Sequence, residues 1–89
     1  ISEAWFGQSQ AGSQLYVYND GPARSRMALR YKVKPAKADW SDERTFFDMG
    51  IHNSYPTLIE IAPGEYRAVW DSGDEKRHRR AIRFGKLKL

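Results

Sequence analysis

The stretch 26–34 reads Arg-Met-Ala-Leu-Arg-Tyr-Lys-Val-Lys and alternates apolar with basic residues. The apolar positions are Met27, Leu29, Tyr31 and Val33, and the basic positions are Arg26, Arg30, Lys32 and Lys34. Successive side chains of a β-strand point to opposite faces, so a strand buries one set and leaves the other in water. On a helix the two sets would interleave around the cylinder. The stretch therefore predicts an amphipathic strand whose apolar face the rest of the chain covers.

Strand-forming segments and turn signals alternate along the whole chain. Segments rich in β-branched and aromatic residues, such as Gln14–Asn19 and Thr57–Ile61, are separated by clusters of Gly, Pro, Asn, Asp and Ser. The turn signals recur roughly every eight to twelve residues, which is typical of a small sandwich or barrel. We therefore expect an all-β fold, a small antiparallel β-sandwich of immunoglobulin-like or jelly-roll type with about six to eight short strands.

The length of the chain bounds its organisation. Because 89 residues leave no room for two domains, we interpret residues 1–89 as a single β-sandwich domain. The chain begins at Ile1 and not at Met, so we expect it to be part of a longer protein. No apolar run approaches the roughly 18–20 residues that a membrane-spanning helix needs. The compartment is left open, with an extracytoplasmic or secreted location favoured.

The connections are predicted from their own residues. Pro35 ends the strand before it, and 36–44 is expected to be a long loop with one helical turn. His52–Pro56 is predicted to turn the chain, and Ala62–Glu65 holds the Pro-Gly pair of a type II turn. Asp71–Glu75 is expected to be the tip of the following hairpin.

The last predicted strand covers Arg79–Phe84. On the premise that apolar side chains face the core, Ile82 and Phe84 point inward and Arg83 points outward. After Gly85 the apolar residues move from even to odd positions. This change of phase predicts a β-bulge at the glycine.

The basic run Lys76–Arg80 is the strongest local signal for binding. Clustered Lys and Arg are typical of contacts with phosphate, sulfate or nucleic acid, which predicts a polyanion site at Arg77, Arg79 and Arg80. Two other interpretations stay open. The carboxylates within 71–75 neutralise part of the run, and basic residues also suit an exposed edge strand, where they discourage aggregation.

The outward residues of the 26–34 strand extend this basic surface if the last strand lies beside it. Arg30 and Lys32 belong to the outward set, and Tyr16 and Tyr18 offer rings that stack on bases or sugars. Basic residues with interleaved aromatic rings are typical of proteins that bind single-stranded nucleic acid. They are equally typical of a sandwich whose outer sheet is positively charged.

Aromatic residues offer a second kind of site. Trp40 and Tyr55, together with His52 and Trp70, are candidates for a carbohydrate platform, since flat rings match the apolar faces of pyranoses. Trp70 ends a strand and is expected in the core. Trp40 lies in a polar loop and is expected to be exposed, which in a small domain indicates contact with a ligand.

Metal sites find little support in the sequence. The chain contains no cysteine, which excludes disulfides and cysteine-based zinc sites. His52 and His78 lack the spacing of a ligand pair, and 71–75 does not match the EF-hand calcium loop. We therefore expect no metal and no cofactor.

Catalytic motifs are also missing, with no Gly-x-Ser-x-Gly and no glycine-rich phosphate loop. Asp48 and Glu60 form the one candidate carboxylate pair, and both are expected to face solvent. We therefore expect no enzyme but a non-catalytic binding or interaction module for a protein or carbohydrate ligand. The net charge of +4 supports an alternative, a small β-domain that binds nucleic acid or another polyanion through its basic strand face.

Overall fold

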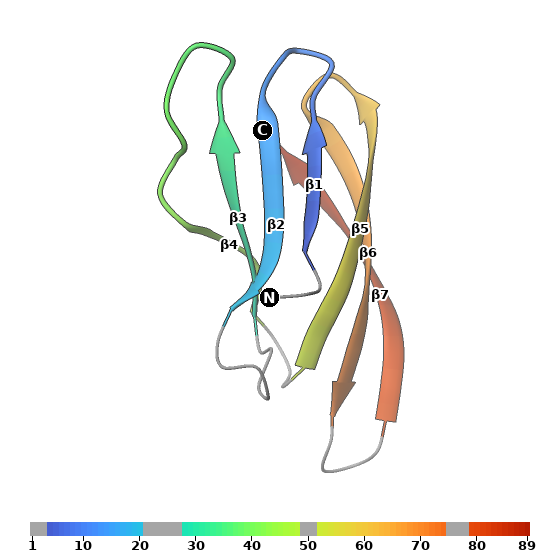
Figure 1. The fold of residues 1–89 in the computed structure, drawn as a ribbon. Coiled ribbons are helices and arrows are strands. Elements are labelled where there is room, and N and C mark those ends of the chain that lie inside the picture. The colour runs from blue at the N-terminus through green and yellow to red at the C-terminus, as the bar shows by residue number, and fades with distance from the viewer. Residues whose placement is uncertain (1–3, 21–27, 49–51, 75–78) are drawn as a thin grey trace.

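The computed structural model describes residues 4–20, 28–48, 52–74 and 79–89 of the chain. Its strands are β1 (Trp5–Gln8), β2 (Gln14–Asp20), β3 (Ala28–Lys34), β4 (Arg44–Phe47), β5 (His52–Ala62), β6 (Glu65–Asp74) and β7 (Arg79–Lys88). They form a four-stranded sheet, β1-β2-β3-β4, and a three-stranded sheet, β5-β6-β7, with every neighbouring pair antiparallel. Figure 1 shows the two sheets as two layers. The predicted antiparallel β-sandwich is confirmed, with seven strands in the described ranges.

Each strand pairs with its neighbour in sequence, so both sheets are meanders. Immunoglobulin-like sandwiches order their strands differently, because their Greek-key connections place strands that are distant in sequence side by side. Here the chain passes from one sheet to the other once, between β4 and β5. The short strands β1 and β4 therefore lie at the two edges of one sheet, and β5 and β7 at the edges of the other.

The alternation that predicted β3 is confirmed over the part of it that the structure describes. Leu29 and Val33 are buried and Tyr31 packs against the core, whereas Arg30 and Lys32 lie on the opposite side of the sheet. Arg26 and Met27, the first residues of the predicted strand, lie outside the described residues. The strand ends at Lys34, immediately before Pro35, as expected.

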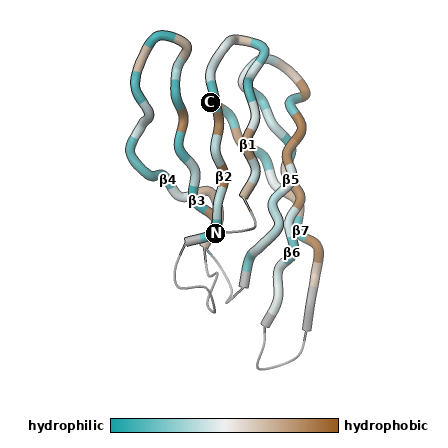
Figure 2. The backbone as a smooth tube through the Cα atoms, viewed as in Figure 1, coloured by the Kyte–Doolittle hydropathy of each residue, from teal (hydrophilic) through white to brown (hydrophobic). Residues whose placement is uncertain are grey.

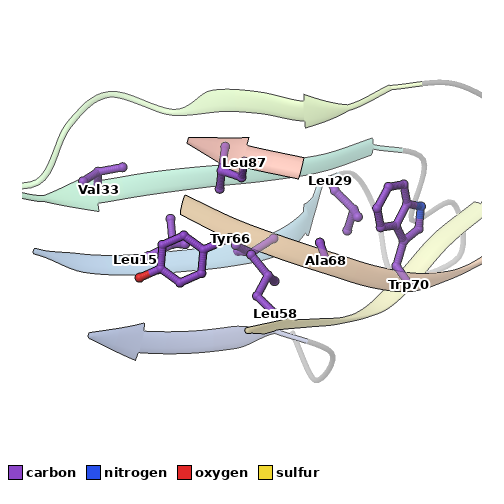
Figure 3. Close-up of a cluster of buried hydrophobic side chains, with 9 residues drawn as sticks. Leu15, Leu29, Val33, Leu58, Tyr66, Ala68, Trp70 and Leu87 are labelled. Carbon is purple, nitrogen blue, oxygen red and sulfur yellow. The ribbon is translucent and has the colours of Figure 1, made fainter. Parts of the chain in front are cut away.

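The core fills the space between the two sheets (Figure 3). It consists of Leu15, Val17, Leu29 and Val33 from one sheet and Leu58, Tyr66, Ala68, Trp70 and Leu87 from the other. The ring of Trp70 packs against Gly85 of β7. A Cβ atom at Gly85 would approach that ring to 2.9 Å, so only glycine leaves room for it.

The predicted orientation of the last strand is wrong. Ile82 and Phe84 lie on the outer side of the three-stranded sheet, and Arg83 lies on the inner side, opposite Trp70. The pairing of β6 with β7 continues through Gly85 without a shift in register, so the predicted bulge is absent. The rings of β6 already fill the inner layer, and the core accepts only small or flexible side chains from this part of β7.

Two predicted turns are instead parts of strands. His52–Pro56 belongs to β5, and the pairing shifts between Ser54 and Thr57, where Tyr55 has a φ of 54°. A bulge of this kind accommodates a proline inside a strand. Residues 71–74 belong to β6, so the tip of the β6–β7 hairpin lies outside the described residues.

The loop 36–44 and the turn Ala62–Glu65 are the two remaining predicted connections. The loop 36–44 contains a turn closed by a hydrogen bond from the Ala38 amide to the Pro35 carbonyl, at 3.2 Å, in place of the predicted helical turn. The type II turn at Ala62–Glu65 is confirmed, because Gly64 has a φ of 77°. The sequence also predicts a strand over Thr45–Ile51 with a bulge at Gly50, and this glycine lies outside the described residues.

Candidate functional site

Four predicted ligand-binding residues lie together on the outer side of the four-stranded sheet. Tyr16 pairs with Lys32 and Tyr18 pairs with Arg30 across β2 and β3. The two tyrosine rings are stacked, with centroids 4.9 Å apart and planes inclined by 21°. The alternation of both strands predicted this shared face correctly.

The carboxylate of Glu43 engages two of these residues. The Tyr18 hydroxyl donates a hydrogen bond to Glu43 Oε2, and Arg30 Nε lies 4.0 Å from Glu43 Oε1. Arg30 Nη1 also donates to Thr45 Oγ1 on β4. Two of the four predicted ligand-binding residues on this surface are therefore already in contact with a carboxylate.

Trp40 is exposed, as predicted, and lies beside an aromatic residue that the sequence did not single out. Its ring centroid is 6.3 Å from that of Phe6, and the two side chains are 42% and 58% exposed. Phe6 pairs with Tyr16 and shares the outer side of the sheet. The alternation of Trp5 with Phe6 was the available signal, since a strand that buries Trp5 exposes its neighbour.

The remaining predicted residues lie elsewhere. Tyr55 is exposed on β5, in the other sheet, where it lines a cavity of about 490 Å³ with residues of β6 and β7. Arg79 and Arg80 are the first residues of β7, and Arg77 lies outside the described residues. β3 and β7 belong to different sheets, so β7 does not pair with the strand that carries Arg30 and Lys32.

The outer side of the three-stranded sheet carries an apolar face, defined here as Ile59, Val69, Ile82 and Phe84. Ile59 is 66% exposed, Ile82 60% and Phe84 79%. Val69 lies directly opposite Phe84. Hydrophobic positions recur along both β5 and β7 in Figure 2. The sequence did not reveal this face because apolar residues were assumed to point inward.

A groove of about 410 Å³ runs between β4 and β7, along the side of the sandwich where both sheets end. Phe46, Phe47 and Trp70 line it from within, and five consecutive residues of β7, 82–86, line its other wall. Arg83 spans the groove, since Nε donates to Ser72 Oγ at 3.1 Å and the guanidinium lies 5.2 Å from the Phe47 ring centre.

On the opposite side of the sandwich, Glu60 connects the two sheets. Its carboxylate was predicted to face solvent, but it accepts several hydrogen bonds from the protein. Its carboxylate accepts hydrogen bonds from Ser9 Oγ at 2.5 Å and from the Gln10 amide at 2.8 Å, both in the β1–β2 turn. It also accepts one from the Gly64 amide at 2.8 Å. One side chain therefore holds the turns of both sheets together, which is a structural role.

Two pKa values respond to this arrangement. The hydrogen bond from Ser9 lowers the pKa of Glu60 below its usual 4.5, partial burial opposes the change, and the Gly64 and Gln10 amides add to the lowering. The pKa of Tyr66 is raised, first by burial and then by the negative charge of Glu60, against a smaller opposite effect of the Ser9 hydroxyl.

Glu60→Gln is expected to destabilise the domain at neutral pH and to have little effect in acid. The folded-state pKa of Glu60 lies below the unfolded one, so its contribution is present above about pH 4.5 and is lost as pH falls through the folded value. Melting temperatures of both proteins at about pH 7 and about pH 3 measure the difference. A gap between them that stays constant over this range would contradict the assigned role.

The described part of the chain shows neither a metal-binding cluster nor a helix that could span a membrane. Within the described ranges, no three His, Cys, Asp or Glu side chains are grouped as metal ligands. The same ranges hold no helix long and apolar enough to cross a membrane.

Comparison of the chain with protein-family models, curated proteins and solved structures finds no match. The function must therefore be inferred from the surfaces described above.

Proposed function

We propose that this domain is a non-catalytic binding module that docks a protein partner through its apolar face. The observation that carries the proposal is the exposure of Ile59, Ile82 and Phe84, between 60% and 79%, on one side of one sheet. Apolar side chains grouped on a surface leave water only when another molecule covers them. An exposed apolar surface of this kind marks an interaction site on a small domain.

The energetics of such a surface suit a specific complex. Each Ile or Phe gains about 1.5–3 kcal/mol when it passes from full exposure to full burial. Arg67 and Lys86 lie opposite each other across β6 and β7, on the same outer side of the sheet as Phe84. An apolar centre beside charged residues is the usual composition of a protein–protein interface.

The double variant Ile59→Ser/Phe84→Ser is expected to lose the partner without losing the fold, because both side chains are exposed. The measurement is capture of proteins from the source cell on the immobilised domain, quantified by mass spectrometry, with melting temperature as the check on folding. We expect recovery of the partner to fall at least about tenfold, as for a central interface residue. Trp40→Ala, in the loop between β3 and β4, is the matched control and should leave recovery unchanged.

A partner that is captured equally well by the double variant would contradict the use of the apolar face. Salt provides a second criterion. Contacts made by apolar side chains respond little to ionic strength, whereas contacts with several phosphates weaken steeply as salt rises. Capture that collapses between low and physiological salt would favour the polyanion alternative.

A carbohydrate site on the four-stranded sheet is a second candidate function, and the exposed Phe6–Trp40 pair favours it. Two rings beside Tyr16 offer a surface on which a sugar ring can lie. In a glycan-binding screen, Trp40→Ala should then remove a signal that Ile59→Ser/Phe84→Ser retains. The polyanion alternative has less support, because Glu43 engages Arg30 and the basic strands lie in separate sheets.

A further inference from the structure

The sandwich has four edge strands, and three of them are protected against pairing with another chain. β1 and β4 contain four residues each, and β5 has a register shift at Tyr55 and Pro56. Short strands, bulges, prolines and charged side chains are the usual means by which sheets block their edges. β7 has only the charged side chains, because its ten residues contain no proline and pair with β6 in unbroken register.

The free edge of β7 borders the groove. In the part of the chain that the structure describes, β7 pairs with β6 alone, so its other edge presents unpaired amide and carbonyl groups. The five groove-lining residues, 82–86, come from both faces of β7, which means that the groove follows this edge. The rings of Phe46, Phe47 and Trp70 provide an apolar wall for the inward side chains of an added strand.

The charge of β7 selects what can pair with it. Five of its ten residues are Arg or Lys, and none is acidic. Lys88 lies 3.7 Å from Glu65, whereas Arg83 and Lys86 contact no carboxylate among the described residues. Lys86 instead lies opposite Arg67, a like-charge pair that disfavours the isolated sheet. A second copy of β7 would add to this repulsion, and an acidic strand would relieve it.

We propose that the edge of β7 binds an extended segment of the partner protein in which apolar and acidic residues alternate, as an added strand of the three-stranded sheet. The inference rests on the proposed function and specifies how the partner is held. Backbone hydrogen bonds to β7 provide affinity, and the alternate side chains provide selectivity. The apolar residues point inward into the groove, and the carboxylates point outward, toward Lys86.

The probes are two capped peptides of about eight residues, one alternating Val with Glu and one alternating Val with Lys. We expect the Val-Glu peptide to bind the 89-residue domain, with the largest amide chemical-shift changes along β7, and the Val-Lys peptide not to bind. A Val-Glu peptide with N-methylated amides cannot donate hydrogen bonds to a strand edge. It should bind at least about tenfold more weakly.

Lys86→Glu tests the charge requirement. Lys86 is exposed and contacts no described carboxylate, so the substitution is expected to preserve the fold. Affinity for the Val-Glu peptide should fall at least about tenfold, and the Val-Lys peptide should begin to bind. Lys37→Glu makes the same change in the exposed loop after β3 and should leave both affinities unaltered.

The contrary outcomes separate this inference from the proposed function. Equal binding of the methylated and unmethylated peptides, lost in Ile59→Ser/Phe84→Ser, would overturn strand addition and leave the apolar face as the docking site. Failure of the Val-Glu peptide to bind would mean that the basic residues only protect the edge, which also overturns it. Self-association of the domain without peptide, seen by sedimentation, would assign the edge to a second copy.

Discussion

Leu29→Asp is expected to prevent folding. Leu29 is 0% exposed and lies in the core between the two sheets. Replacing a buried leucine by a smaller residue costs about 2–5 kcal/mol, and an unpaired buried carboxylate adds several more. A domain of this kind has a total stability of about 5–15 kcal/mol, so little or none would remain. Loss of the cooperative thermal transition and collapse of the amide spectrum are the measurements.

Lys32→Asp is the matched control for this prediction. Lys32 belongs to the same strand but lies on the outer side of the sheet, opposite Tyr16. We expect its melting temperature to stay within about 5 °C of the unmodified domain, since surface substitutions usually change stability by less than about 0.5 kcal/mol. Similar losses in the two variants would mean that the register of β3 is wrong.

Asn53→Leu is expected to destabilise the domain by about 2–5 kcal/mol, although leucine is nearly the same size and more apolar. Asn53 is buried and its Oδ1 accepts hydrogen bonds from Trp70 Nε1 at 3.1 Å and from Ser72 Oγ at 3.0 Å. The substitution removes the acceptor and leaves buried donors without it. Chemical denaturation should show a reduced midpoint with an unchanged slope.

Ser72→Ala separates the contribution of the Asn53 amide from that of the serine hydroxyl. It removes the donor to Asn53 Oδ1 and the acceptor of Arg83 Nε but leaves Asn53 Oδ1 bonded to Trp70, and because Arg83 is exposed to water, the loss should be nearer about 1 kcal/mol. If Asn53→Leu proved as stable as the unmodified domain, packing of the leucine would compensate fully for the lost hydrogen bonds to Trp70 and Ser72. The buried Asn53 amide would then make no net contribution to the free energy of unfolding.

The sequence predicted a strand well where one face of the strand is buried and the other is exposed to solvent. β2 and β3 alternate strictly, and their faces are as expected because any other register would expose Leu15 or Leu29. The segment Arg79–Phe84 of β7 alternates as well, yet its predicted orientation was wrong. Alternation shows that two faces differ, and it does not show which face meets the core. In β7 the bulk of Trp70 decides, since it leaves room for Gly85 but not for a larger side chain.

The same reasoning explains what was and was not predicted of the candidate sites. Tyr16, Tyr18, Arg30 and Lys32 share a face through local alternation, which a sequence displays. The contacts of Glu43 with Tyr18 and Arg30 depend on the path of the loop 35–43, which no local pattern specifies. Whether two basic strands adjoin depends on which sheet each joins, and that follows from packing of the whole chain.

The closure by Glu60 has a mechanical consequence. The cross-sheet hydrogen bonds to Glu60 end on β5, and a further one does so as well, from the Asn19 side-chain amide to the Asn53 carbonyl. On the groove side the sheets meet through rings, with Phe46 and Phe47 centred 5.3 and 5.0 Å from Trp70. Ring contacts tolerate sliding that hydrogen bonds do not. We therefore expect a rotation of one sheet against the other to disturb the contacts along β5 least, and such a rotation would widen the groove for thicker side chains.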